Sequence, residues 1–245
     1  MQTIQKKKYP MHKSAFIFAS LALVGGFLEA YTYILHGGVF CNAQTGNLVL
    51  FFLGLTDGEW AAASHYLYSI LAYIGGILLS AGLPLLLKRH SHIAVASFEI
   101  AALVAIAFLP QGAPDWYTYV SVSFLCAVQY NTFTECRGAK LATTFCTNNL
   151  RQAALGLFSA VKDRDSTALR RAGVYGSMLL FFAAGAVAGS FAARGLGNYS
   201  ALIAAAALLP ALVLLIVRRG SPLPPQGDAP AAAEDAREDG EAICE

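Results

Sequence analysis

Glu29 is the residue of this sequence most suited to chemistry, because it is a carboxylate inside an apolar run at residues 14–35. At membrane depth a charged carboxylate costs several kcal/mol unless it is paired, protonated or hydrated. Two functional roles meet this condition: a protonatable group that couples a movement to an ion gradient, and a ligand for a cationic group. The alternative role is structural, as a carboxylate bonded to a neighbouring helix or close enough to the surface to reach water.

A second candidate region is the stretch at residues 38–55, which is apolar enough for a membrane but has polar interruptions. Its amide and hydroxyl side chains stand at Asn42, Gln44, Thr45 and Asn47. Gly46 permits the backbone to leave helical geometry at this point. The polar side chains therefore either meet a polar solute or satisfy the backbone groups that such a break sets free.

The same pattern recurs 102 positions later in the chain. Residues 45–55 and 147–157 share six identical positions of eleven, and the matching candidate residues are Thr147 and Asn149. A helix that starts at either place would offer unpaired N–H groups to an anion or a polar ligand. Two polar interruptions at matching places suggest one site, with two helix caps as the alternative.

Three further polar residues of the second half complete the candidate set. Arg151 stands where the first copy has Val49, and Asn131 aligns with Glu29 in the repeat, with Gln129 beside it. Arg151 either balances a carboxylate such as Glu29, or binds an anionic solute, or reaches the lipid headgroups. These residues are candidates for substrate binding or coupling.

The composition indicates what kind of protein must position these residues. Charged residues make up 13% of the 245 residues and hydrophobic residues 56%, whereas soluble domains carry about 25% charged residues. Several apolar runs are long enough to cross a bilayer, which takes about 20 helical residues. The predicted fold class is all-α, a polytopic transmembrane helix bundle with membrane lipid as a partner.

Six spanning helices are predicted, at residues 14–35, 64–87, 93–109, 116–135, 172–193 and 198–217. The polar stretches at 38–55 and 141–161 either cross as well, giving eight crossings, or enter without crossing. The positive-inside rule favours six crossings, because the lysines and arginines of the loops then share one side with the N-terminal lysines. Both chain ends are accordingly expected in the cytoplasm, and Asp57 and Glu59 outside.

The six-crossing arrangement predicts an inverted internal repeat. The two halves, residues 14–109 and 116–217, then have three crossings and one polar segment each, and an odd number of crossings turns the second half over. Small residues at Gly185-x-x-x-Gly189 and Gly76-x-x-x-Ser80 are typical of closely packed membrane helices. Flanking this domain we expect a cytoplasmic segment at 1–13 and a disordered acidic tail at 220–245.

The sequence lacks the common signatures of enzymes and nucleotide-driven pumps. It contains no GxxxxGK[ST], HExxH or GxSxG motif, and no basic face with aromatic residues that would indicate nucleic-acid binding. His90 and His92 lie in a basic loop without carboxylate or thiol neighbours, so no metal is expected. We expect no enzymatic activity, no cofactor and no nucleic-acid partner, and leave homo-oligomerisation open.

Several short motifs together resemble those of one family. They are Gly25-Gly26-Phe27-Leu28-Glu29-Ala30, Gly38-Val39-Phe40, Thr45-Gly46-Asn47 and Ala142-Thr143-Thr144-Phe145-Cys146-Thr147. Over residues 14–219 the chain resembles the YoaK family of bacterial inner-membrane proteins, DUF1275. The resemblance implies an uncharacterised multi-pass protein of the bacterial inner membrane and supplies no substrate.

These observations favour one function over a second. The leading hypothesis is a secondary transporter or permease for a small polar solute, with its site between the two polar stretches. The alternative is a membrane scaffold or sensor that transports nothing, in which the polar residues hold helices together and the acidic tail recruits a partner.

Overall fold

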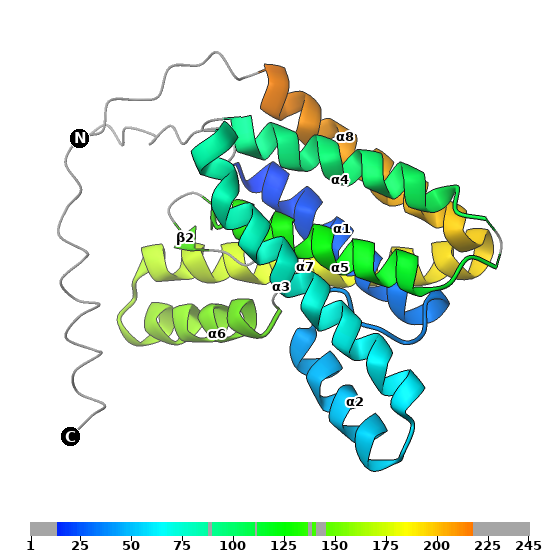
Figure 1. The fold of residues 1–245 in the computed structure, drawn as a ribbon. Helices are drawn as coiled ribbons and strands as arrows, with labels where there is room; N and C mark the ends of the chain where they lie inside the picture. Colours follow the sequence, from blue (N-terminus) through cyan, green and yellow to red (C-terminus); the bar gives the residue numbers. More distant parts are fainter. Residues whose placement is uncertain (1–13, 88–89, 111, 137–138, 141–145, 218–245) are drawn as a thin grey trace.

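The computed structural model describes residues 14–87, 90–110, 112–136, 139–140 and 146–217, and Figure 1 shows their arrangement. The predicted N-terminal segment at 1–13 and the acidic tail at 220–245 lie outside the described residues. So do the first residues of the polar stretch at 141–161.

The described chain is all-helical, as predicted, apart from one very short hairpin. The first half contains α1 (Ala15–Leu35), α2 (Gln44–Thr56), α3 (Trp60–Leu87) and α4 (Ser91–Ala107). The second half contains α5 (Trp116–Thr132), α6 (Cys146–Lys162), α7 (Ser166–Leu196) and α8 (Ala201–Val217), with a 3₁₀ turn, η3 (Gly197–Ser200), between α7 and α8. The antiparallel hairpin pairs β1 (Glu135–Cys136) with β2 (Ala139–Lys140).

Each of the six predicted spans coincides with a helix, and their ends are set by local chemistry. The helix predicted at 172–193 starts six residues earlier, because the side chain of Asp165 caps α7 by accepting from the Thr167 N–H at 2.7 Å. This hydrogen bond lowers the pKa of the Asp165 carboxyl. At the other end, Gly197 has a positive φ of 55°, which a glycine adopts without strain, and α7 stops there.

Three helical stretches of the described chain are long and apolar enough to cross a membrane. They are α1, α3 and the run from Ser166 to Val217 that includes α7 and α8, while α2 and α4 are shorter apolar helices. Large apolar side chains also cover the outside, for example Leu85 and Leu86, which are 82% and 81% exposed. Such a surface fits a hydrocarbon environment.

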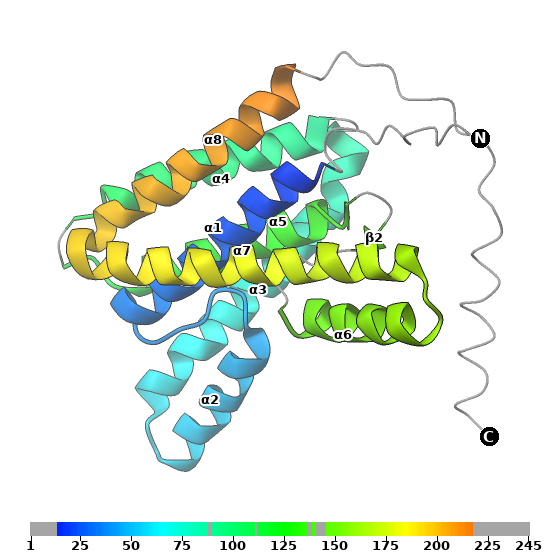
Figure 2. The ribbon, with the colours of Figure 1, turned by 180° about the vertical axis from the view of Figure 1, so that it is seen from behind.

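The helices pack in pairs, as the two opposite views in Figures 1 and 2 show. The most extensive contacts join α1 to α7 and α3 to α5, α2 packs on α3, and α6 packs on α7. α4 pairs with α8 along one side of the bundle. α2 and the beginning of α3 project from the other helices, and α6 lies along the beginning of α7.

The core lies around α1, where three aromatic side chains are almost completely enclosed. Phe18, Phe27 and Tyr31 of α1 are among the largest fully buried side chains, together with Tyr119 and Phe133. The rings of Phe18 and Phe133 meet edge to face with centroids 6.4 Å apart. α1 contacts α5, α7 and α8, so this core joins the first helix of the chain to three helices of its second half.

Glycines let the main helices approach until their backbones touch. A Cβ atom on Gly185 of α7 would overlap the carbonyl oxygen of Leu23 in α1, and one on Gly189 would overlap that of Phe27. On the other side of the bundle, Gly76 of α3 meets the backbone of α5 at Phe124 in the same way. The predicted close packing at these small residues is confirmed.

We expect Gly185→Ala to destabilise the protein by about 1–3 kcal/mol, because the added methyl group has no space against α1. Gly176→Ala is the matched control, since the same helix offers nothing within 4 Å of a Cβ atom there. A helical Gly→Ala change without a clash is neutral or stabilises by up to about 1 kcal/mol. Thermal unfolding in detergent would measure both, and equal melting temperatures would contradict the packing argument.

Candidate functional site

The carboxylate of Glu29 closes the loop that leads from α1 into α2. It accepts hydrogen bonds from the backbone N–H groups of Asn42 and Ala43, at 2.7 and 3.1 Å, and from the thiol of Cys41 at 3.1 Å. Ala43 is the N-cap residue of α2 and has no capping side chain of its own. Glu29 therefore caps α2 from a neighbouring helix.

This position stabilises Glu29 without a cation. The first N–H groups of a helix lack partners within the helix, and the helix dipole places partial positive charge at the same end. Arg151, which could have balanced the carboxylate, is exposed, and no ion pair joins it to Glu29 among the described residues. The geometry thus matches the structural alternative for Glu29, with its oxygens turned toward the start of α2.

Asn42 fills the space between this loop and α1. Its Nδ2 atom donates to the Gly25 carbonyl oxygen at 3.1 Å and contacts the Cys41 sulfur at 3.3 Å. Its Oδ1 atom is buried and receives no hydrogen bond from the described residues. A buried acceptor of this kind is costly unless a water molecule or a ligand supplies a donor.

Asn47 clamps the same loop from the first turn of α2. Its Oδ1 atom accepts from the Phe40 N–H at 3.0 Å, and its Nδ2 atom lies 2.6 Å from the Phe40 carbonyl oxygen. Nδ2 also lies 2.9 Å from Gln44 Oε1 and 3.1 Å from Ser69 Oγ. Asn47 is 0% exposed, so its amide satisfies backbone and side-chain groups of the protein.

The hydrogen-bond network around Asn47 extends across the bundle through two serines. Ser69 Oγ of α3 lies 2.7 Å from Ser123 Oγ of α5, and both residues are buried. The hydrogen bonds therefore connect the loop, α2, α3 and α5 in one network. Gln44 belongs to it as well, because its Nε2 donates to the Cys41 carbonyl oxygen at 3.0 Å.

The predicted site residues of the second half take different positions. Asn131 donates from Nδ2 to Ser80 Oγ of α3 at 3.0 Å, away from Glu29, with which the repeat aligned it. Asn149 is buried like its counterpart Asn47, whereas Thr45, Thr147 and Arg151 are exposed on α2 and α6. The structure thus separates the candidates into enclosed amides and exposed residues at the starts of the two helices.

The beginning of α6 comes close to the Glu29 carboxylate. The charge of Glu29 acts on the thiol of Cys146, the first residue of α6, and adds to burial in raising the pKa of this thiol. Glu29 also binds the start of α2, so the first residue of α6 and the start of α2 are both within the electrostatic range of one carboxylate.

Gln129 faces a carboxylate that the sequence analysis missed. This carboxylate belongs to Glu99 on α4, and it is 1% exposed. The nearer atom of the Gln129 amide lies 2.7 Å from Glu99 Oε1 and 3.1 Å from Oε2. The signal was present in the sequence, since Glu99 interrupts the apolar run at 93–109 just as Glu29 interrupts the run at 14–35.

A buried histidine joins the end of α1 to the start of α5. Nδ1 of His36 lies 2.9 Å from Oδ1 of Asp115, and its ring packs edge-on against Tyr31 with centroids 5.0 Å apart. Burial lowers the pKa of His36, and the carboxylate of Asp115 opposes that shift only in part. The pair therefore holds the helix ends chiefly as a hydrogen bond to a neutral imidazole.

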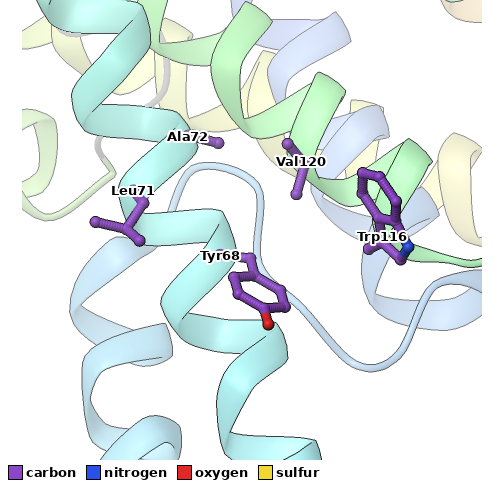
Figure 3. A pocket seen from close by; sticks show the side chains of 5 residues that line it. All are labelled: Tyr68, Leu71, Ala72, Trp116 and Val120. Atoms are coloured by element: carbon purple, nitrogen blue, oxygen red, sulfur yellow. The ribbon is translucent and has the colours of Figure 1, made fainter.

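A groove on the outside of the bundle is a separate feature. It measures about 460 Å³ and lies between α3 and α5, lined by Tyr68, Leu71, Ala72, Trp116 and Val120. Figure 3 shows these side chains on the two facing helices. The lining is mostly apolar and includes none of the polar candidates, so this groove is distinct from the site around Glu29.

Together these features define an all-helical protein whose long apolar helices suit a membrane and whose interior contains the buried carboxylate of Glu99 and the partly buried carboxylate of Glu29. A family model described as "Protein of unknown function (DUF1275)" matches residues 17–215. The chain belongs to the DUF1275 family, which confirms the resemblance found in its motifs. No curated protein and no solved structure matches the chain.

Asn47→Ala should lower the free energy of unfolding by about 2 kcal/mol or more, because it leaves the polar backbone atoms of Phe40 without their partner. Thr45→Ala, two residues earlier on the exposed side of α2, should change it by less than about 0.5 kcal/mol. Thermal unfolding in detergent compares the two. Similar losses in both variants would mean that Asn47 does not clamp the loop.

Proposed function

We propose that the protein is a secondary transporter of a small polar solute, with its site where α2 and α6 begin. The observation that carries the proposal is that α2 starts on the Glu29 carboxylate, with the first residue of α6 within the electrostatic range of the same group. Transporters commonly place substrates at such interrupted helices, where backbone N–H groups and polar side chains can meet the solute. No enzymatic reaction and no cofactor are part of this proposal.

An inverted repeat is part of the proposal, and helix pairing supports it. If α1–α4 correspond to α5–α8 in order, the contact between α1 and α7 corresponds to the contact between α5 and α3. In the same way, the contact between α2 and α3 corresponds to the contact between α6 and α7. The contact between α1 and α8 corresponds to the contact between α5 and α4. Each half therefore makes with the other half the contacts that a two-fold relation requires.

The proposed topology has six crossings, with α2 and α6 entering the membrane and leaving on the side from which they came. α2 has 13 residues, which gives a length of about 20 Å against a hydrocarbon core of about 30 Å. α6 has polar residues exposed at its start and Lys162 in its last turn. Both termini would then lie in the cytoplasm, and the family resemblance favours the bacterial inner membrane.

The structure suggests a division of roles among the candidate residues. Glu29, Asn42, Gln44, Asn47 and Asn149 would hold the two helix starts in place. Thr45, Thr147 and Arg151, which are exposed at those starts, would contact the solute.

To test transport, we would reconstitute the protein in vesicles and screen uptake of polar metabolites. Glu29→Gln should reduce uptake about tenfold or more, because hydrogen bonds to a charged group contribute about 1.5–3 kcal/mol. Thr56→Ala, at the exposed far end of α2, is the control and should leave uptake unchanged. Absence of uptake across a broad panel would count against the proposal.

The topology has its own test in cysteine labelling. Asp57→Cys should react with an impermeant maleimide from outside the cell, and His90→Cys only from the cytoplasmic side, because α3 crosses between them. A background in which the native cysteines are replaced keeps the signal specific. Labelling of both positions from one side would rule out six crossings.

A scaffold or sensor without transport is the second candidate, and one observation favours it. The amide of Asn47 bonds only to protein groups, as expected for residues that merely hold helices together. Under this alternative, Glu29→Gln would leave cellular function intact, and a partner would be captured in a manner that depends on residues 220–245.

A further inference from the structure

We propose that Glu99 and Gln129 form a proton-binding site, in which Glu99 carries a proton at neutral pH and Gln129 is a partner for both of its protonation states. The site is distinct from the Glu29 cap and lies between α4 and α5. That Glu99 binds a proton does not depend on transport. Its use as the coupling site, with the proton as the coupling ion, rests on the proposed transport function.

Among the residues that the structure describes, no opposite charge stabilises the Glu99 carboxylate through an ion pair. α4 packs chiefly on α8, which contains no ionisable side chain from Ala201 to Val217. α5 contributes Gln129 and the thiol of Cys126. Among the described residues no lysine, arginine or histidine forms an ion pair with Glu99.

The carboxylates of Glu29 and Glu99 differ in their hydrogen-bond donors. Glu29 receives two backbone N–H groups and a thiol at the start of a helix, which favours the ionised form. Glu99 faces a single neutral amide, although it is 1% exposed. An isolated buried carboxylate is much more costly than a neutral carboxylic acid, so the proton belongs on Glu99.

The Gln129 amide can hydrogen-bond to Glu99 in either protonation state, because rotation of the amide group exchanges the positions of its nitrogen and oxygen. With its nitrogen toward Glu99, it donates to both carboxylate oxygens, at 2.7 and 3.1 Å. With its oxygen there, it accepts the O–H of a protonated Glu99 at 2.7 Å, an ordinary distance for such a bond. Its nitrogen then lies 3.5 Å from the Leu21 carbonyl oxygen of α1.

The proton step itself is simple. When α4 and α5 separate enough to admit water, the Glu99 carboxylic acid gives its proton to a water molecule, and the Gln129 amide turns its N–H groups toward the new carboxylate. Return of the proton reverses both changes.

Infrared spectroscopy of the full-length protein in lipid vesicles at neutral pH tests this directly, without any substrate. We expect a carboxylic-acid C=O band in the wild type that is absent in Glu99→Gln and retained in Glu29→Gln. Because the group is buried, the band should shift only slowly after transfer to D₂O. Gln129→Leu should keep the band but move it to higher frequency, since its hydrogen bond is lost.

A wild-type spectrum without the band, or a band that persists in Glu99→Gln or vanishes in Glu29→Gln, would overturn the proposal. If Glu99→Gln does not fold, the proposal is tested by the frequency of the C=O band in Gln129→Leu. A band at the wild-type frequency in this variant would overturn the proposal. The infrared spectra test proton binding by Glu99, whereas vesicle uptake tests transport. Failure of the proton-site proposal can therefore be told apart from failure of the transport proposal.

Discussion

The arrangement of the polar interior depends on the contact between the Glu29 carboxylate and the free N–H groups at the start of α2. A helix that begins inside a bundle needs an acceptor for these groups, because an unpaired buried N–H is costly. Glu29 meets that need from α1, and the helix end in turn makes a buried negative charge tolerable. Each group thus removes the penalty of burying the other.

The position of the loop before α2 follows from this contact. With Asn42 and Ala43 held against α1, the Phe40 backbone lies within reach of Asn47, and Ser69 extends the network to α5 through Ser123. The network thus joins the loop, α2 and α3 to α5, which lies further along the chain. Polar residues that look like a binding motif in the sequence therefore serve first to fix the backbone, which leaves the exposed residues at the helix starts for a solute.

Backbone contact between helices sets the spacing within which these polar groups meet. Gly185 and Gly189 bring α7 onto α1, and Gly76 brings α3 onto α5. The loop before α2 also packs against a main chain, since Asn42 donates to the Gly25 carbonyl oxygen of α1. Glu99 and Gln129 meet across the interface of α4 and α5, and no ion pair joins Glu99 to a basic side chain among the described residues.

The sequence by itself determined the helical class, the positions of the long helices, the small residues at their contacts and the importance of Glu29, because apolar run length and residue type are local properties. Only the tertiary structure decided which polar side chains contact one another. The sequence could not show that Glu99 faces Gln129, or that Asn131 donates a hydrogen bond to Ser80. Those contacts depend on how each helix is rotated about its axis and how closely it packs, which the whole bundle sets.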